Sequence, residues 1–198
     1  MQKPANNDFP ILDQLRQRWS PRAFSNRPIP PESVRSLLEA ARWSPSCHNA
    51  QPWRFILAAG QAEGEFQAAL ACLREGNRNW AASAPLLLFA VARMNFDKGG
   101  DNRHAFYDTG QAMAHLSIQA TALGLFVHQM GGILPDQVRQ TYGLPEGFEP
   151  VSAAAIGYYG ESDSLDEGLR KKELAPRIRN GVSEFAFSGA WERPAAQK

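Results

Sequence analysis

The stretch SPSCHNAQPWRF, residues 44–55, decides how the rest of the chain is interpreted. Pro45 and Pro52 frame a short run of polar residues, and the apolar run WRFILAA follows at once. Prolines at both ends fix φ and stiffen a loop, and an apolar run bounded by a turn is typical of a strand. The stretch therefore predicts a rigid loop with polar side chains that leads directly into a strand over 52–59.

A second unusual stretch, RWSPRAF at residues 18–24, places two arginines around a hydroxyl group. In an extended loop, residues two apart point the same way, so Arg18, Ser20 and Arg22 would form a phosphate-sized cradle of donors. Pro21 would stiffen that loop. A solvated turn whose arginines pair with nearby acids explains the same residues. The stretch alone leaves both interpretations open.

The spacing of apolar residues predicts alternating helices and strands. Their number is compatible with an α+β or an α/β layered domain, and the pattern does not choose between them. Residues 161–176 are polar and predict a solvated loop or arm, whereas three aromatic residues in 183–191 predict a tail that lies on another surface. The expected helices lie within 9–20 and 30–44 and at 64–75, 105–123 and 135–142, and the expected strands at 52–59, 84–92, 125–130 and 151–160.

Composition limits the kinds of partner. The chain has 198 residues, 21 Lys and Arg against 20 Asp and Glu, and a net charge of +1, so no global field favours nucleic acid or an anionic membrane. The length fits one domain. Two distant cysteines, Cys47 and Cys72, indicate a reducing compartment rather than a disulfide scaffold. With no apolar signal segment at its start, the chain is expected to be cytoplasmic.

Several familiar sites are absent or weak. The chain has neither the glycine fingerprint of dinucleotide-binding folds nor that of P-loops. Cys47 and His48 are adjacent, but sequence neighbours usually point apart, so a cysteine that lines a pocket or interface is favoured over a nucleophile. His115 and His128 lie in apolar segments and are interpreted as core histidines with satisfied hydrogen bonds.

A metal site at His104 and Asp108 is also considered. The two residues are four apart and could meet on one helix face, with Asp97 and Asp101 upstream. No further ligand stands at a convincing spacing, so a solvated, capped helix entrance is favoured.

Taken together, four motifs resemble the FMN-dependent nitroreductase family. They are RWSPR at 18–22, PSCHNAQPW at 45–53, LGLFVHQMGG at 123–132 and RIR at 177–179. Each is weak alone, but they occur in the family's order and span nearly the whole chain. The resemblance implies an α+β, nitroreductase-like fold: a central, mostly antiparallel sheet flanked by helices, in an intertwined homodimer. Residues 1–198 would be one domain, with an arm from about 160 to 198 reaching the partner subunit.

The resemblance also implies a set of FMN-binding residues. The flavin phosphate would be held by Arg18, Ser20, Arg177 and Arg179, while Arg22 would reach the ribityl chain or the N1/C2=O edge of the ring. A loop from the other subunit would cover the dimethylbenzene side, and two glycines would approach flavin N5 where a Cβ would obstruct the ring. The loop residues are Pro45, Ser46, Cys47 and Asn49, the glycines are Gly131 and Gly132, and Arg78 would contact the ring edge.

The implied activity is ping-pong transfer of electrons from NADH or NADPH, through flavin N5, to a small-molecule acceptor such as a nitroaromatic or a quinone. No side chain need serve as a catalytic acid or base, because the flavin carries the chemistry. Two alternatives remain: a specialised flavin enzyme of the same fold, such as a reductive dehalogenase, and a non-catalytic flavin-binding module.

Overall fold

Strand β2, Leu86–Arg93, is apolar almost throughout and has strands on both sides. The computed structural model describes residues 1–60 and 64–195, and within these residues four strands form one sheet in the order β1-β2-β4-β3. Every neighbouring pair is antiparallel. The expected α+β fold with a mostly antiparallel sheet is therefore confirmed. The other strands are β1 (Trp53–Ala59), β3 (Phe126–Met130) and β4 (Phe148–Gly157).

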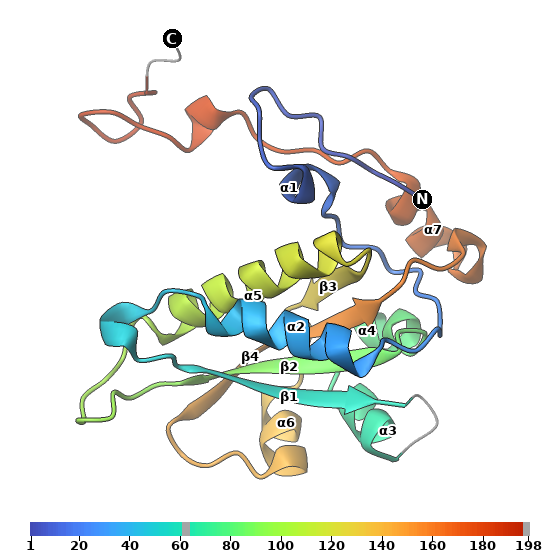
Figure 1. The fold of residues 1–198 in the computed structure, drawn as a ribbon, viewed down its shortest axis with the longest axis horizontal. Coiled ribbons are helices and arrows are strands. Elements are labelled where there is room, and N and C mark those ends of the chain that lie inside the picture. The colour runs from blue at the N-terminus through green and yellow to red at the C-terminus, as the bar shows by residue number, and fades with distance from the viewer. Residues whose placement is uncertain (61–63, 196–198) are drawn as a thin grey trace.

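Helices cover both faces of the sheet (Figure 1). Successive side chains of a strand point to opposite faces. Accordingly, Leu86 and Leu88 pack in a cluster with helices α2 and α5, whereas Leu87 and Phe89 pack in a cluster with α3, α4 and α6. Burial on both sides explains why β2 is continuously apolar. The helices are α2 (Pro31–Arg42), α3 (Gly64–Ala71), α4 (Glu75–Ala81), α5 (Ala105–Ala122) and α6 (Pro135–Tyr142).

The ends of the elements follow local backbone chemistry. Gly124 has φ +71° just after α5, the left-handed conformation that the sequence predicts for the end of this helix. Strand β4 begins three residues earlier than expected and contains an irregularity opposite Ala90 and Val91. Pro150 lies at that point, where a residue without a backbone N–H interrupts the ladder.

Three expectations about helices need correction. Helix α1, Asp13–Gln17, is a short part of the predicted segment. Helix α4 is absent from the predicted set, since Gly76 and the two asparagines of EGNRNWA are weak helix formers. The prediction of a solvated loop over 161–176 is wrong for its second half, because residues 167–174 form α7 (Glu167–Leu174) and bury Glu173.

The N-terminal segment and the segment after α7 run side by side above the sheet in Figure 1. Arg177 donates from Nη1 to the carbonyl oxygens of Lys3 and Arg16, at 2.6 and 3.0 Å. Beyond this contact, the chain leaves the body as an arm whose described part ends at residue 195; residues 196–198 of the predicted arm lie outside the described residues. Among the described residues, no helix combines the length and apolar character needed to cross a membrane.

Candidate functional site

One small cleft brings together five residues that the sequence singles out. Arg18, Ser20 and Arg22 come from the loop after α1, and Arg177 and Arg179 come from the segment after α7. The cleft has a volume of about 180 Å³. Two segments more than 150 residues apart therefore converge as the phosphate-cradle interpretation expects. The cleft is also lined by Lys3, Trp19, Lys172, Glu173, Ala175 and Pro176.

The electrostatics of this cationic cleft favour an anion. Six of its lining side chains are Lys or Arg and one is acidic. Burial lowers the pKa of Arg18, and the nearby charge of Arg179 lowers it further. The pKa of Arg177 is likewise lowered, first by burial and then by Arg18 and Arg179. Because guanidinium groups stay charged, burial and mutual repulsion both make this cluster of cations unfavourable, and a bound anion would relieve the repulsion.

A buried carboxylate holds the loop that carries Arg22. Glu173 is 1% exposed, and its two oxygens accept the backbone N–H of Arg22 at 3.1 and 3.0 Å. One of them also lies 3.3 Å from the N–H of Ala23. Hydrogen bonds to an ionised acceptor are stronger than neutral ones. Glu173 therefore fixes the backbone from which the Arg22 side chain leaves.

The same loop is held on its other sides. His128 of β3 contacts the carbonyl oxygen of Pro21 through Nδ1 at 2.8 Å, so Nδ1 carries the proton. Ser25 N donates to Tyr158 O, and Gly160 N donates to Ala23 O, both at 2.9 Å. A Cβ at Gly160 would lie 2.6 Å from the backbone of Phe24, so only glycine permits this approach.

The cationic side chains differ in how many of their donors are already used. Arg18 donates to the Ser20 hydroxyl at 3.3 Å, which joins the two residues on one side of the loop as predicted. Arg177 donates twice from Nη1 to carbonyl oxygens of the N-terminal region, and Arg179 donates to Ile178 O. Arg177 thus serves both as a wall of the cleft and as a clamp between the two ends of the chain.

The two glycines after β3, Gly131 and Gly132, have different surroundings. A Cβ at Gly131 would meet nothing within 4 Å, so this glycine faces open space. A Cβ at Gly132 would lie 2.4 Å from Nδ2 of Asn77, whose amide donates to the Gly132 carbonyl at 3.2 Å. The open side of Gly131 is compatible with close approach of a flat ligand, whereas a Cβ at Gly132 would displace the Asn77 side chain from its contact with this segment.

The loop of Pro45, Ser46, Cys47 and Asn49 lies elsewhere. It follows α2, at the left of Figure 1, whereas α7 and the N-terminus lie at the right. Three non-glycine residues in it have positive φ, namely His48 at 52°, Asn49 at 54° and Gln51 at 45°. The structure does not bring this loop to the cationic cleft of the same chain.

Hydrogen bonds impose the strained backbone of this loop. The buried carboxylate of Asp108 on α5 accepts the N–H of Cys47 at 3.0 Å, and the Ser46 hydroxyl accepts the N–H of Gln51 at 3.0 Å. Left-handed non-glycine residues cost energy and persist where their surroundings determine them, often at functional sites.

Local contacts place the histidines and Arg78 that the sequence analysis considers. His115 pairs with the Ser44 hydroxyl at 2.8 Å, but it is exposed, so its interpretation as a core histidine is wrong. His128 is half-buried and has the Pro21 carbonyl oxygen as its partner. The guanidinium of Arg78 donates to the carbonyl oxygens of Leu70 and Leu73 and caps the end of α3, while its contact with the flavin ring edge stays a prediction. In the parts of the chain that the structure describes, no three His, Cys, Asp or Glu side chains gather in a way that could hold a metal ion.

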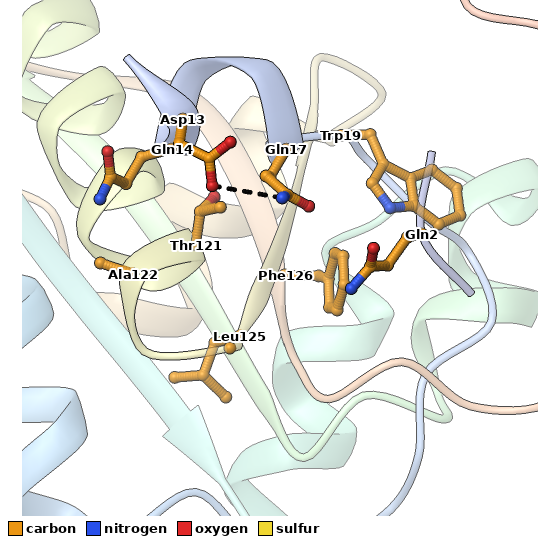
Figure 2. A pocket seen from close by; sticks show the side chains of 10 residues that line it. Gln2, Asp13, Gln14, Gln17, Trp19, Thr121, Ala122, Leu125 and Phe126 are labelled. Atoms are coloured by element: carbon orange, nitrogen blue, oxygen red, sulfur yellow. Dashed lines mark hydrogen bonds between the residues drawn. The ribbon is translucent and has the colours of Figure 1, made fainter. Parts of the chain in front are cut away.

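A second cavity, of about 350 Å³, lies beside the cationic cleft between α1 and the end of α5. Trp19 lines both cavities, and the adjacent residues Gln2 and Lys3 line one each. Figure 2 shows Trp19 and Gln2 at one end of this cavity and Gln14 and Ala122 at the other. The N-terminal segment at Gln2 and Lys3 therefore separates the two cavities.

Sequence reasoning missed three charged residues of the cleft. Lys3 precedes any recognisable motif, and Lys172 and Glu173 lie in a charged stretch that looks solvated. None of the three carries a signal in the sequence, because the burial of Glu173 among the exposed charges of α7 is visible only in the structure.

Comparisons with known proteins agree on one family. A model of the Nitroreductase family matches residues 15–158. A solved structure described as "The crystal structure of the oxidoreductase containing FMN" is 34% identical, with a TM-score of 0.89, and the match covers 94% of this chain and 95% of that chain.

Two curated relatives also match more than two thirds of this chain. An uncharacterized 15.4 kDa protein of Mycolicibacterium smegmatis is 32% identical over 139 residues, which are 69% of this chain and 90% of the relative. A putative NADH dehydrogenase/NAD(P)H nitroreductase of Stenotrophomonas maltophilia (strain K279a) is 29% identical over 172 residues, 76% of this chain and 86% of the relative.

Glu173→Gln is expected to lower the free energy of unfolding by about 1–3 kcal/mol. The amide has one acceptor oxygen in place of two, and its NH₂ group would face the buried N–H of Arg22 or Ala23. Chemical denaturation of the variant checks this, with Glu167→Gln on the exposed start of α7 as the control. Equal stability of the two variants would contradict the role given to Glu173.

His128 predicts a loss of stability in acid. Burial lowers its pKa from 6.5 to about 4, against the opposing hydrogen bond to Pro21. Between those values the unfolded chain binds more protons than the folded one, so the free energy of unfolding falls as pH decreases. The loss between pH 7.5 and 4.5 amounts to about 2.5 kcal/mol.

The variant His128→Gln keeps a donor for Pro21 but does not titrate. Between pH 7.5 and 4.5, the free energy of unfolding of this variant should fall by about 2.5 kcal/mol less than that of the wild type. Carboxylates titrate in both proteins, so the difference between their pH profiles isolates the histidine. Parallel profiles would show that His128 is not the titrating group.

Proposed function

Since the chain belongs to the nitroreductase family, we propose that it binds FMN and acts as an NAD(P)H-dependent oxidoreductase on small-molecule acceptors. The observation that carries this proposal is the cationic cleft, in which six basic side chains converge with one carboxylate among them. An overall charge of +1 gives no reason for such a gathering, but a phosphate dianion does.

The residues of the cleft fit the phosphate end of FMN. Arg18 and Ser20 would donate from one side and Arg179 from the other, while the guanidinium nitrogens of Arg177 not used by the N-terminal region would complete the cradle. Arg22, held by Glu173, would reach the ribityl chain or the flavin ring. The open side of Gly131 would leave room for the ring.

Bound FMN would supply hydride acceptance at N5 and onward electron transfer. The chain's own residues would bind and orient the cofactor, and none is proposed as a catalytic acid or base. We propose a ping-pong order, in which NAD(P)H binds first and leaves before the acceptor enters the same place. Names of similar proteins, such as the NAD(P)H nitroreductase of Stenotrophomonas, support nitroaromatics or quinones as the first acceptors to test.

A homodimer is part of this proposal. Apolar side chains of the N-terminal region are exposed, with Leu12 at 67%, and α5 exposes Tyr107 at 70%. The C-terminal arm exposes Phe185 and Trp191, at 66% and 81%, and the hydrogen bonds of its described residues 181–195 are made within the arm. Exposed apolar groups on three separate segments are expected to be covered by a second copy.

The split arrangement of the site supports the same assembly. The loop of Pro45, Ser46, Cys47 and Asn49 lies away from the cationic cleft of its own chain. We propose that it covers the dimethylbenzene side of the flavin bound to the partner, so that each of two sites takes residues from both chains. The free cysteines, Cys47 and Cys72, fit a reducing compartment, and we propose the cytoplasm.

The test of the function is spectroscopic. Purified protein supplied with FMN should retain a flavin absorbance band that NADH or NADPH bleaches under anaerobic conditions. Addition of a nitroaromatic or a quinone should then restore the band. Protein that retains no FMN would overturn the proposal, and stoichiometric FMN that neither nicotinamide reduces would identify a non-catalytic flavin-binding module instead.

Arg18→Ala is expected to weaken FMN binding by about 1.5–3 kcal/mol, the contribution of a charge-assisted hydrogen bond. Its control is Arg16→Ala, which removes the same charge from an exposed ion pair with Asp13 outside the cleft. Fluorescence titration of apo-protein with FMN measures both. The phosphate assignment is wrong if Arg18→Ala and Arg16→Ala bind FMN equally well.

A further inference from the structure

We propose that Lys3 is an additional ligand of the cofactor phosphate, and that residues 2–5, here named the N-terminal strap, form one wall of the FMN site. This inference rests on the proposed binding of FMN. It adds a residue that lies outside the four sequence motifs and outside the region matched by the family model, residues 15–158.

The position of the Lys3 ammonium group is the first argument. It lines the cationic cleft together with Arg18 and Arg177. Its Nζ donates to the carbonyl oxygens of Glu173 and Ala175, each at 2.6 Å. An ammonium group has three donors, so one remains for a ligand in the cleft.

The second argument is that the strap is fixed at several points. Ala5 N donates to Arg16 O at 2.7 Å, and Arg177 Nη1 donates to Lys3 O at 2.6 Å. The Lys3 ammonium also lies 4.9 Å from the centroid of the Trp19 ring, a cation–π contact. A charged side chain held at both its backbone and its tip is pre-organised, so little conformational entropy is lost when it binds a phosphate.

The third argument is electrostatic. Burial lowers the pKa of Lys3, the Glu173 carboxylate opposes this shift, and the charge of Arg177 adds to it. An anion in the cleft would lie near Lys3, Arg18 and Arg177 together and would stabilise the charged form of all three. The strap thus places a further cation where the existing cations already repel one another.

A purely structural role is the alternative. Lysine side chains near a helix C-terminus often bind its last carbonyl oxygens, and Lys3 does this for α7. Such a cap would support the fold of the cleft without touching the ligand. The two roles differ in what they do to a ligand that lacks the phosphate.

The experiment compares FMN with riboflavin, which has the same ring and ribityl chain but no phosphate. Dissociation constants of both are measured by fluorescence titration of the full-length apo-protein, in the wild type, Lys3→Met and Lys3→Arg. Lys171→Met on the exposed surface of α7, outside the cleft, removes the same charge as a control. Melting temperatures of the apo-proteins report any loss of fold.

Lys3→Met should raise the dissociation constant of FMN about tenfold or more, the effect of one charge-assisted hydrogen bond. The value for riboflavin should change by less than about twofold, Lys3→Arg should recover most of the FMN affinity, and Lys171→Met should resemble the wild type. An unchanged FMN value, or equal weakening of FMN and riboflavin, would overturn the inference while FMN binding itself stands. Wild-type protein that does not bind FMN would refute the proposed function.

Discussion

The bond between the Glu173 carboxylate and the backbone N–H groups of Arg22 and Ala23 is the interaction on which the rest of the site depends. A loop that carries two arginines toward further cations would be driven outward by repulsion. Glu173 holds the loop by its backbone, which leaves the Arg22 side chain available. The carboxylate is also the single negative charge among the lining residues of the cleft, so it offsets part of the repulsion without neutralising the site.

Much of the fold follows from local sequence. The alternation of Leu86, Leu87, Leu88 and Phe89 between two helical layers requires a strand buried on both faces, and such a strand has to be continuously apolar. Gly124 marks the end of α5 because its φ of +71° suits glycine. By contrast, α4 forms although EGNRNWA has weak intrinsic helix propensity. Tertiary contacts account for this helix: Trp80 is buried in the core, and Asn77 bonds the Gly132 carbonyl.

The residues of the candidate site that lie in short motifs could be predicted from the sequence. Arg18, Ser20 and Arg22 lie two apart in one loop, so their convergence is a local property of extended backbone. Lys3 and Glu173 have no such signal, because each acquires its role from a contact with a segment about 150 to 170 residues away. The sequence also does not distinguish the two glycines. In the structure Gly132 contacts Asn77, whereas no atom lies within 4 Å of a Cβ placed at Gly131.

The cationic cleft also links the proposed function to stability. The pKa values of Arg18 and Arg177 are lowered, first by burial and then by neighbouring arginines, so the cleft opposes folding as long as no anion is bound. A ligand that binds only the folded state stabilises it in proportion to its affinity and concentration. The same repulsion that makes the empty cleft unfavourable therefore becomes a source of affinity for a phosphate. A site of this kind couples retention of the cofactor to the integrity of the loop, α7 and the N-terminal strap at once, because all three segments contribute charges to it.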